Sequence, residues 1–166
     1  TFYEGATRIP ETAAPNTKNT SWTMEAMVET SPKNKDGVIN AIGGSGAGYT
    51  LYVKDGYPTF LYNFFEADIV TIKSSKKLPD GLASIKVDFK YDGGGEGKGA
   101  LLTLLLNNEK VGESRIERTV PGRFGIDTFG IGEDSGSPVT HHYKPPFSYQ
   151  GHIKEVNIDL IPEKKS

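Results

Sequence analysis

Apolar and polar residues alternate with a period of two along several stretches of this chain. Between residues 22 and 28 one set of alternate positions is apolar, namely Trp22, Met24, Ala26 and Val28. Residues 82–91 repeat the pattern with Ala83, Ile85, Val87, Phe89 and Tyr91. A period of two is typical of a half-buried β-strand, so both stretches are predicted strands. Residues 100–106 are almost continuously apolar, which predicts a strand covered on both faces.

The clearest local signal is the dipeptide Asp55-Gly56, which stands between two alternating segments. Asp-Gly favours a type I′ turn, because both central residues of that turn need positive φ. Because Pro58 lacks an amide hydrogen, we expect an edge or a bulge on its side away from the hairpin. A two-residue loop also fixes the register, with the pairs Val53–Pro58, Leu51–Phe60 and Tyr49–Tyr62 on one face and Tyr52–Thr59 and Thr50–Leu61 on the other.

The second half of the chain continues the strand pattern. Asn107-Asn108 tolerates left-handed backbone geometry and predicts a turn into a strand over residues 110–117. In the last segment, 151–160, the apolar positions change parity after Ile153, which predicts a β-bulge near Lys154-Glu155. About ten strands, no convincing helix and frequent turns are typical of a sandwich or barrel. We therefore expect an all-β fold, a sandwich of two antiparallel sheets around one core.

Composition narrows the function classes. The chain has 166 residues with 19 Lys+Arg against 21 Asp+Glu, a net charge of -2 and no cysteine. This length predicts one domain, 1–166, in which residues 1–21, rich in Thr, Pro and Asn, form a lead-in segment that packs on it. Without cysteine the chain forms no disulfide and no thiolate metal site. The near-neutral balance argues against a nucleic-acid partner, and no apolar run is long enough to span a membrane.

The candidate catalytic motifs are incomplete. The glycine-rich run 92–99 resembles a phosphate loop, but Asp92 stands where the motif needs glycine, and a glycine follows Lys98 where it needs Ser or Thr. The run is also expected to join two strands, whereas a phosphate cradle uses a helix N-terminus. His141 and His142 are adjacent, so on a strand they point to opposite faces. Composition alone leaves a Ser-His-Asp triad open, but there is no Gly-x-Ser-x-Gly elbow, and we predict no catalytic residue.

Two kinds of binding site are candidates. The loop around Asp134 offers oxygen ligands for a structural calcium ion, although Glu133, Asp92 or Asp127 would have to complete the ligand set. The alternative is a plain turn before Pro138. Tyrosine rings at the rim of a sandwich can stack on sugars, and the alternative role of such rings is to fill the core. The tyrosines considered for sugar binding are Tyr52, Tyr57, Tyr143 and Tyr149.

Four segments read together resemble a known family. Two of them carry unusual combinations, GIGEDSGSPV at 130–139 and PFSYQG at 146–151. The chain resembles the C-terminal region of bacterial arylsulfatases of the alkaline-phosphatase-like superfamily, and the opening residues resemble the stretch that leads into that region. The four segments are 37–63, 78–107, 119–139 and 143–160.

This resemblance implies a concanavalin A-like or laminin G-like jelly roll that serves as a non-catalytic accessory domain. Its partner would be the sulfatase catalytic domain of the same polypeptide, a sulfuric ester hydrolase that uses formylglycine and calcium. No catalytic position transfers, because the nearest match to the formylglycine motif, Thr119-Val-Pro-Gly-Arg123, starts with a threonine that cannot become an aldehyde. The chain starts at Thr1 without Met, so we expect a fragment of a longer protein.

The family's setting adds two further expectations. Its members imply a bacterial protein in the periplasm or outside the cell. The alternative function is a carbohydrate-binding module that recognises a sulfated or other polysaccharide. A chain that hydrolyses aryl sulfate by itself would contradict both interpretations.

Overall fold

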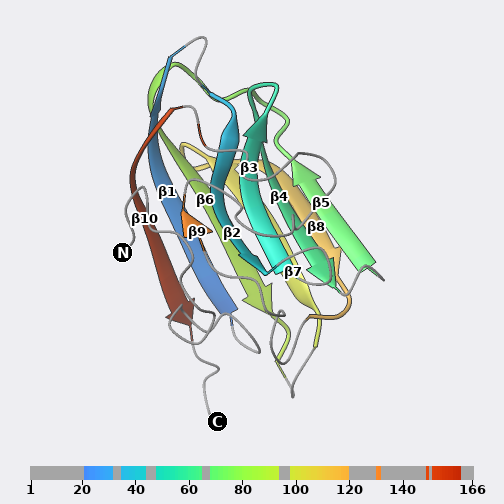
Figure 1. Ribbon diagram of the computed structural model, residues 1–166. Coiled ribbons are helices and arrows are strands. Elements are labelled where there is room, and N and C mark those ends of the chain that lie inside the picture. Colours follow the sequence, from blue (N-terminus) through green and yellow to red (C-terminus); the bar gives the residue numbers. More distant parts are fainter. Residues whose placement is uncertain are drawn as a thin grey trace.

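The computed structural model describes residues 21–31, 35–43, 48–64, 68–93, 98–119, 130–131, 149 and 151–161. Within these ranges the chain forms ten strands and no helix (Figure 1). The predicted all-β class is therefore confirmed. The strands are β1 (Ser21–Thr30), β2 (Gly37–Gly43), β3 (Gly48–Lys54), β4 (Tyr57–Phe64), β5 (Asp68–Lys73), β6 (Gly81–Tyr91), β7 (Ala100–Leu106), β8 (Glu109–Ile116), β9 (Gly130–Ile131) and β10 (His152–Ile161).

The strands form two five-stranded sheets that lie one over the other (Figure 1). The first, called sheet I below, has the order β10-β1-β6-β7-β8. The second, called sheet II below, has the order β5-β4-β3-β2-β9. All neighbouring strands in both sheets pair antiparallel. The predicted sandwich of two antiparallel sheets is confirmed.

An aromatic stack joins the two sheets across the core. Trp22 of β1 is fully buried. Its ring centroid lies 4.9 Å from that of Phe89 in the same sheet and 5.2 Å from that of Tyr49 in sheet II. Aromatic pairs of this kind contribute about 0.5–1.5 kcal/mol beyond their buried area. The alternate apolar positions noted in the sequence are thus the positions that hold the layers together.

The β3–β4 hairpin has the register that its turn predicts. Asp55 and Gly56 have positive φ, 54° and 83°, and all five predicted pairs are present. The edge or bulge expected beside Pro58 is wrong, because β4 also pairs regularly with β5. That ladder starts at Thr59, one residue after the proline, so no amide is missing from it. Pro58 takes part only through its carbonyl, which accepts a hydrogen bond of 2.8 Å from the Ser74 amide.

The parity change in the last strand is a β-bulge, as predicted. Where β1 pairs with β10, Met27 lies opposite Glu155, but Val28 lies opposite Ile153. Lys154 is therefore the extra residue. The bulge returns Ile153 to the core face, where only 1% of its surface is exposed.

The prediction that β7 is covered on both faces is wrong. Its residues alternate between buried and half-buried, with Leu101 and Leu105 on the half-buried outer face of sheet I. Leu105 pairs with Lys86 on one side and Lys110 on the other. Long lysine side chains lay their methylene groups over apolar neighbours while the ammonium stays in water. Such flanking explains how an exposed face can carry leucines without a second covering layer.

Sheets I and II approach closely at one edge, between β5 and β8. The Ser75 amide, just after β5, donates a 3.0 Å hydrogen bond to the carbonyl of Val111 in β8. Gly112 follows, and a Cβ added there would lie 2.5 Å from Cγ2 of Ile72. The contact leaves no room for a side chain, which explains a glycine inside a strand.

Several expectations fall on residues that the structure does not describe. They are the lead-in segment 1–21 apart from Ser21, the candidate calcium ligand Asp134 and the candidate sugar contact Tyr143. The single-domain boundary 1–166 likewise stays a prediction. Among the described ranges there is no helix whose length and apolar character would let it cross a membrane.

Candidate functional site

Strands β3, β4 and β5 lie side by side in sheet II (Figure 1), and their register places a row of polar residues on the outer face of that sheet. Tyr52 of β3 lies opposite Thr59 of β4, and Thr59 lies opposite Lys73 of β5. Residues directly opposite each other across a sheet point to the same face. The core face of these strands holds the alternate residues, such as Leu51, Phe60 and Ile72. The ladder therefore brings the row together on the side away from the core.

A cavity of about 270 Å³ opens beside this row. Its lining is mixed, because hydroxyl groups, two ammonium groups and one carboxylate surround a tyrosine. Groups of this kind donate and accept hydrogen bonds in several directions. The lining residues are Tyr52, Lys54, Asp55, Thr59, Thr71 and Lys73.

Tyr52 forms the floor of the cavity and is only 3% exposed. Its ring packs with Val38, Ala41 and Leu61 in a small apolar cluster on the outer face of sheet II. Burial raises the pKa of the Tyr52 phenol to about 12, so its hydroxyl keeps its proton at neutral pH. A buried ring offers no open face for stacking. Tyr52 therefore lines the cavity as a buried residue rather than as a stacking platform.

The turn at one end of the cavity is held in place by a carboxylate from the segment before β2. Asp36 accepts hydrogen bonds from the amides of Asp55 and Gly56, each at 3.0 Å. On the other side of the turn, the amide of Leu78 donates to the Gly56 carbonyl at 2.7 Å. Leu78 is itself buried in the core. The rim of the cavity is therefore fixed from two directions.

Tyr57, at the start of β4, lies beside the cavity and carries two lysines over its ring. The ammonium of Lys73 lies 4.4 Å from the ring centroid, and that of Lys77 lies 5.6 Å from it. These are cation–π distances. Tyr57 is also the cross-strand partner of Lys54, which lines the cavity. The ring thus gathers cationic side chains at this end of the site.

The four tyrosines proposed from the sequence do not form one group. Tyr52 and Tyr57 lie near each other, because both belong to the β3–β4 hairpin. Tyr149 is 7% exposed and belongs to the main hydrophobic core. Tyr143 lies outside the described residues. A role of any of them in sugar binding stays a prediction.

Sequence reasoning missed most of the cavity. The outer-face pair Tyr52–Thr59 follows from the hairpin, but Thr71 and Lys73 come from β5, which was not identified as a strand. The alternating segment DIVTIK at 68–73 was the available signal. Nothing in the sequence identifies Asp36 as part of the site, because its hydrogen bonds to the Asp55 and Gly56 amides form only in the folded chain.

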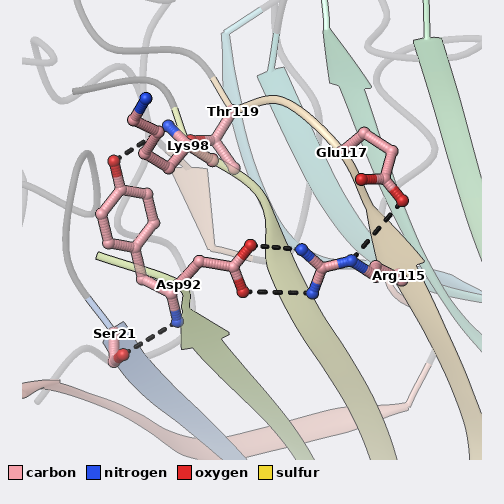
Figure 2. Close-up of polar contacts among 7 residues, drawn as sticks. Ser21, Asp92, Lys98, Arg115, Glu117 and Thr119 are labelled. Atoms are coloured by element: carbon pink, nitrogen blue, oxygen red, sulfur yellow. Dashed lines mark hydrogen bonds and ion pairs between the residues drawn. The ribbon is translucent and has the colours of Figure 1, made fainter. Parts of the chain in front are cut away.

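The glycine-rich run 92–99 joins β6 to β7, as predicted, and its two ends are tied together (Figure 2). Tyr91 accepts a hydrogen bond at its hydroxyl from the Lys98 amide at 2.9 Å. The hydroxyl of Thr119 donates to the Lys98 carbonyl at 2.6 Å. Both contacts are structural, and they hold the base of the loop.

Asp92, a candidate to complete the calcium site, is engaged by Arg115 (Figure 2). The guanidinium donates two hydrogen bonds to the two carboxylate oxygens, one of them at 3.1 Å. The Arg115 hydrogen bond and charge hold the pKa of Asp92 below its ordinary value. The described residues include no group of three or more metal-ligating side chains. The calcium ion remains a prediction that rests on Asp134.

No protein-family model matches the sequence, and no curated protein does. Solved structures match it in fold. Domains LG4-5 of the mouse laminin α1 chain give a TM-score of 0.61 at 13% identity, over 99% of this chain and 43% of that chain. A Bacteroides ovatus protein provisionally described as carbohydrate-binding gives 0.59 at 15% identity, over 98% of this chain and 43% of that one.

A third match is the CBM40 of the Ruminococcus gnavus IT-sialidase. It gives a TM-score of 0.58 at 12% identity, over 90% of this chain and 79% of that chain. The same module has been solved bound to α2,3 sialyllactose.

Identities this low establish the fold and nothing finer. The chain spans less than half the length of the mouse laminin and Bacteroides ovatus chains that it matches. None of these matches links it to arylsulfatases. The fold that the sequence resemblance implied is confirmed: the described strands form a laminin G-like β-sandwich of the jelly-roll type.

Proposed function

We propose that this chain is a non-catalytic carbohydrate-binding module and that it binds a glycan in the cavity on the outer face of sheet II. The observation that carries the proposal is the lining of that cavity. Hydroxyls of Tyr52, Thr59 and Thr71 stand together with the charged groups of Lys54, Asp55 and Lys73. A pyranose has a hydroxyl on nearly every carbon, so it needs donors and acceptors in several directions.

The fold adds support without deciding the ligand. Two of the matching structures are carbohydrate-binding by name, and one of them holds a sialylated sugar. A rigid sheet is also a good base for such a site, because side chains on strands are held more precisely than those on loops. Here five of the six lining residues lie on strands β3, β4 and β5.

The experiment that tests the proposal is a glycan array followed by calorimetric titration of the best ligand. Thr71→Val removes one hydroxyl at nearly constant shape, and Lys73→Ala removes one ammonium. We expect each to weaken binding roughly tenfold, as the loss of one or two useful hydrogen bonds would do. Neither residue is in the core, so the melting temperature should stay close to that of the wild type.

Thr23→Val is the matched control. Thr23 lies on the outer face of sheet I, where it pairs with Asp88 and Asp159. It should leave glycan affinity unchanged. An array with no bound glycan, or equal losses for Thr71→Val and Thr23→Val, would show that the cavity is not a glycan site.

The resemblance to arylsulfatases suggests which kind of protein carries this module. As an accessory domain it would hold a sulfated glycan beside the catalytic domain of the same polypeptide. The support for this setting is the resemblance of the four sequence segments, including 130–139 and 146–151. Sequencing the gene upstream of this segment tests the setting. We expect it to encode a domain with a Cys/Ser-x-Pro-x-Arg motif, and a domain of another enzyme class, or no enzyme domain, would refute the sulfatase setting. A location outside the cytoplasm stays a prediction of the same resemblance.

A further inference from the structure

Four lysines of the segments around the β3–β4 turn and β5 differ in what their ammonium groups contact. Lys35 and Lys76 are paired with carboxylates, to Asp80 and Glu109, each at 2.6 Å. Lys73 and Lys77 are exposed, and within the described part of the chain their ammonium groups contact the ring of Tyr57 and no carboxylate. Two cations near one cavity therefore retain their hydrogen-bonding capacity.

The acidic groups nearby do not cancel this charge. The cavity lining has two lysines against one carboxylate, that of Asp55. Asp36 is close to the same turn, but both of its oxygens already accept amide hydrogen bonds. Lys77 adds a third positive charge beside the lining, through its contact with the Tyr57 ring. The local balance is positive on a chain whose net charge is -2.

We propose that the glycan bound in this cavity carries an anionic group, a carboxylate or a sulfate ester, and that Lys73 and Lys77 bind this group. The inference rests on the proposed glycan function and deepens it. A sugar anion placed beside Tyr57 receives charge-assisted hydrogen bonds from two ammonium groups. The carboxylate of Asp55, in the β3–β4 turn, accepts hydrogen bonds from the sugar hydroxyls.

The contacts of Lys73 and Lys77 with the Tyr57 ring are weak enough for both ammonium groups to shift to a bound ligand. A cation–π contact at an exposed site is weaker than a charge-assisted hydrogen bond to an anion. Each ammonium is therefore kept close to the site by the ring and is transferred readily when an anion arrives. The backbone around the lysines is fixed meanwhile, since the Ser74 amide donates to the Pro58 carbonyl and the Ser75 amide to that of Val111.

The test is a glycan array in which each neutral oligosaccharide stands beside its sulfated and its carboxylate-bearing derivatives. We expect the acidic members to bind at least tenfold more tightly than their neutral counterparts. Lys73→Ala and Lys77→Ala should each weaken binding of acidic glycans far more than binding of neutral ones, and so remove most of that preference. Lys73→Arg keeps the charge and should keep the preference. Lys86→Ala, on the outer face of sheet I, is the control and should change nothing.

The outcomes separate the two proposals. Preference for sulfated members alone, for carboxylates alone or for both supports the inference and identifies the source of the anion. Neutral glycans that bind as tightly as acidic ones overturn the inference and leave the glycan function standing. An array without any bound glycan overturns the proposed function, and the inference with it. High salt provides a second readout, because it should weaken binding of acidic members and not of neutral ones.

Discussion

At the scale of single residues, the structure shows where side-chain volume decides stability. Gly112 lies in β8, in the middle of a strand, where glycine ordinarily costs about 0.5–1 kcal/mol relative to alanine. A larger residue does not fit at this position, because an added Cβ would lie 2.5 Å from Cγ2 of Ile72 in β5. Packing at the sheet edge thus outweighs strand propensity.

Gly112→Ala is expected to destabilise the protein by about 1–3 kcal/mol, the usual cost of overpacking, although propensity alone would stabilise it. Chemical denaturation measures the change. In an Ile72→Ala background the clashing methyl is absent, so the same substitution should cost much less. An equal cost in both backgrounds would mean that the two residues do not touch.

The pair of Asp92 and Arg115 makes a prediction about pH. The Asp92 pKa is held below its ordinary value of 3.8 in the folded chain, so the pair stabilises the fold above that pH. Its contribution is lost as pH falls through the lowered pKa. Arg115→Ala should therefore reduce stability at neutral pH and make no difference at strongly acidic pH. It should also return the Asp92 pKa toward 3.8, which NMR titration of the carboxyl carbon measures. An Asp92 pKa that is the same in both proteins would contradict the pairing.

At the scale of elements, register decides which side chains reach the core. The β3–β4 turn and the β10 bulge both set the register of a strand, one through a tight turn and the other through an extra residue. Asp55-Gly56 sets the pairing of two strands at their start. Lys154 adds one residue and thereby corrects the parity of a strand whose apolar positions would otherwise end on opposite faces.

Two single-residue deletions in β10 test this account of the bulge. Deleting Lys154 should leave a regular ladder, with Ile153 still opposite Val28. The cost should be only the exposed ion pair with Glu29, roughly 0–1 kcal/mol. Deleting Asn157 removes one residue from the regular ladder and forces either Val156 or Ile158 off the core face. Each aliphatic side chain that leaves the core costs roughly 1.5–3 kcal/mol, so the Asn157 deletion should have a much lower melting temperature than the Lys154 deletion. Similar melting temperatures for the two deletions would contradict the bulge.

At the scale of the whole molecule, local and non-local features differ in how far the sequence predicts them. Alternation identified β1 and β6. The dipeptides Asp55-Gly56 and Asn107-Asn108 marked the β3–β4 and β7–β8 turns, because turn geometry is a property of adjacent residues. Asn107 and Asn108 indeed have positive φ, 50° and 66°. The order of strands in a sheet is not local. The row from Tyr52 to Lys73 could not be predicted until β5 was known to lie beside β4.

The same argument explains the uneven result for the candidate site. Tyr52 lines the cavity and Tyr57 lies beside it, because both belong to the β3–β4 hairpin. Tyr149 looks the same in the sequence, yet it is buried in the core, since nothing local distinguishes a rim tyrosine from a core tyrosine. Asp36 holds the turn of the site from a segment that precedes it by about twenty residues. Contacts of that kind are visible only in the folded chain.

The most direct test of the central claim is NMR mapping of the tightest glycan from the array on the isotope-labelled chain. The account predicts that the largest amide shifts fall on β3, β4, β5 and the Asp55-Gly56 turn, with the amides of sheet I almost unchanged. Shifts centred on β1, β6 and β7, or no shifts with any glycan tested, would contradict it.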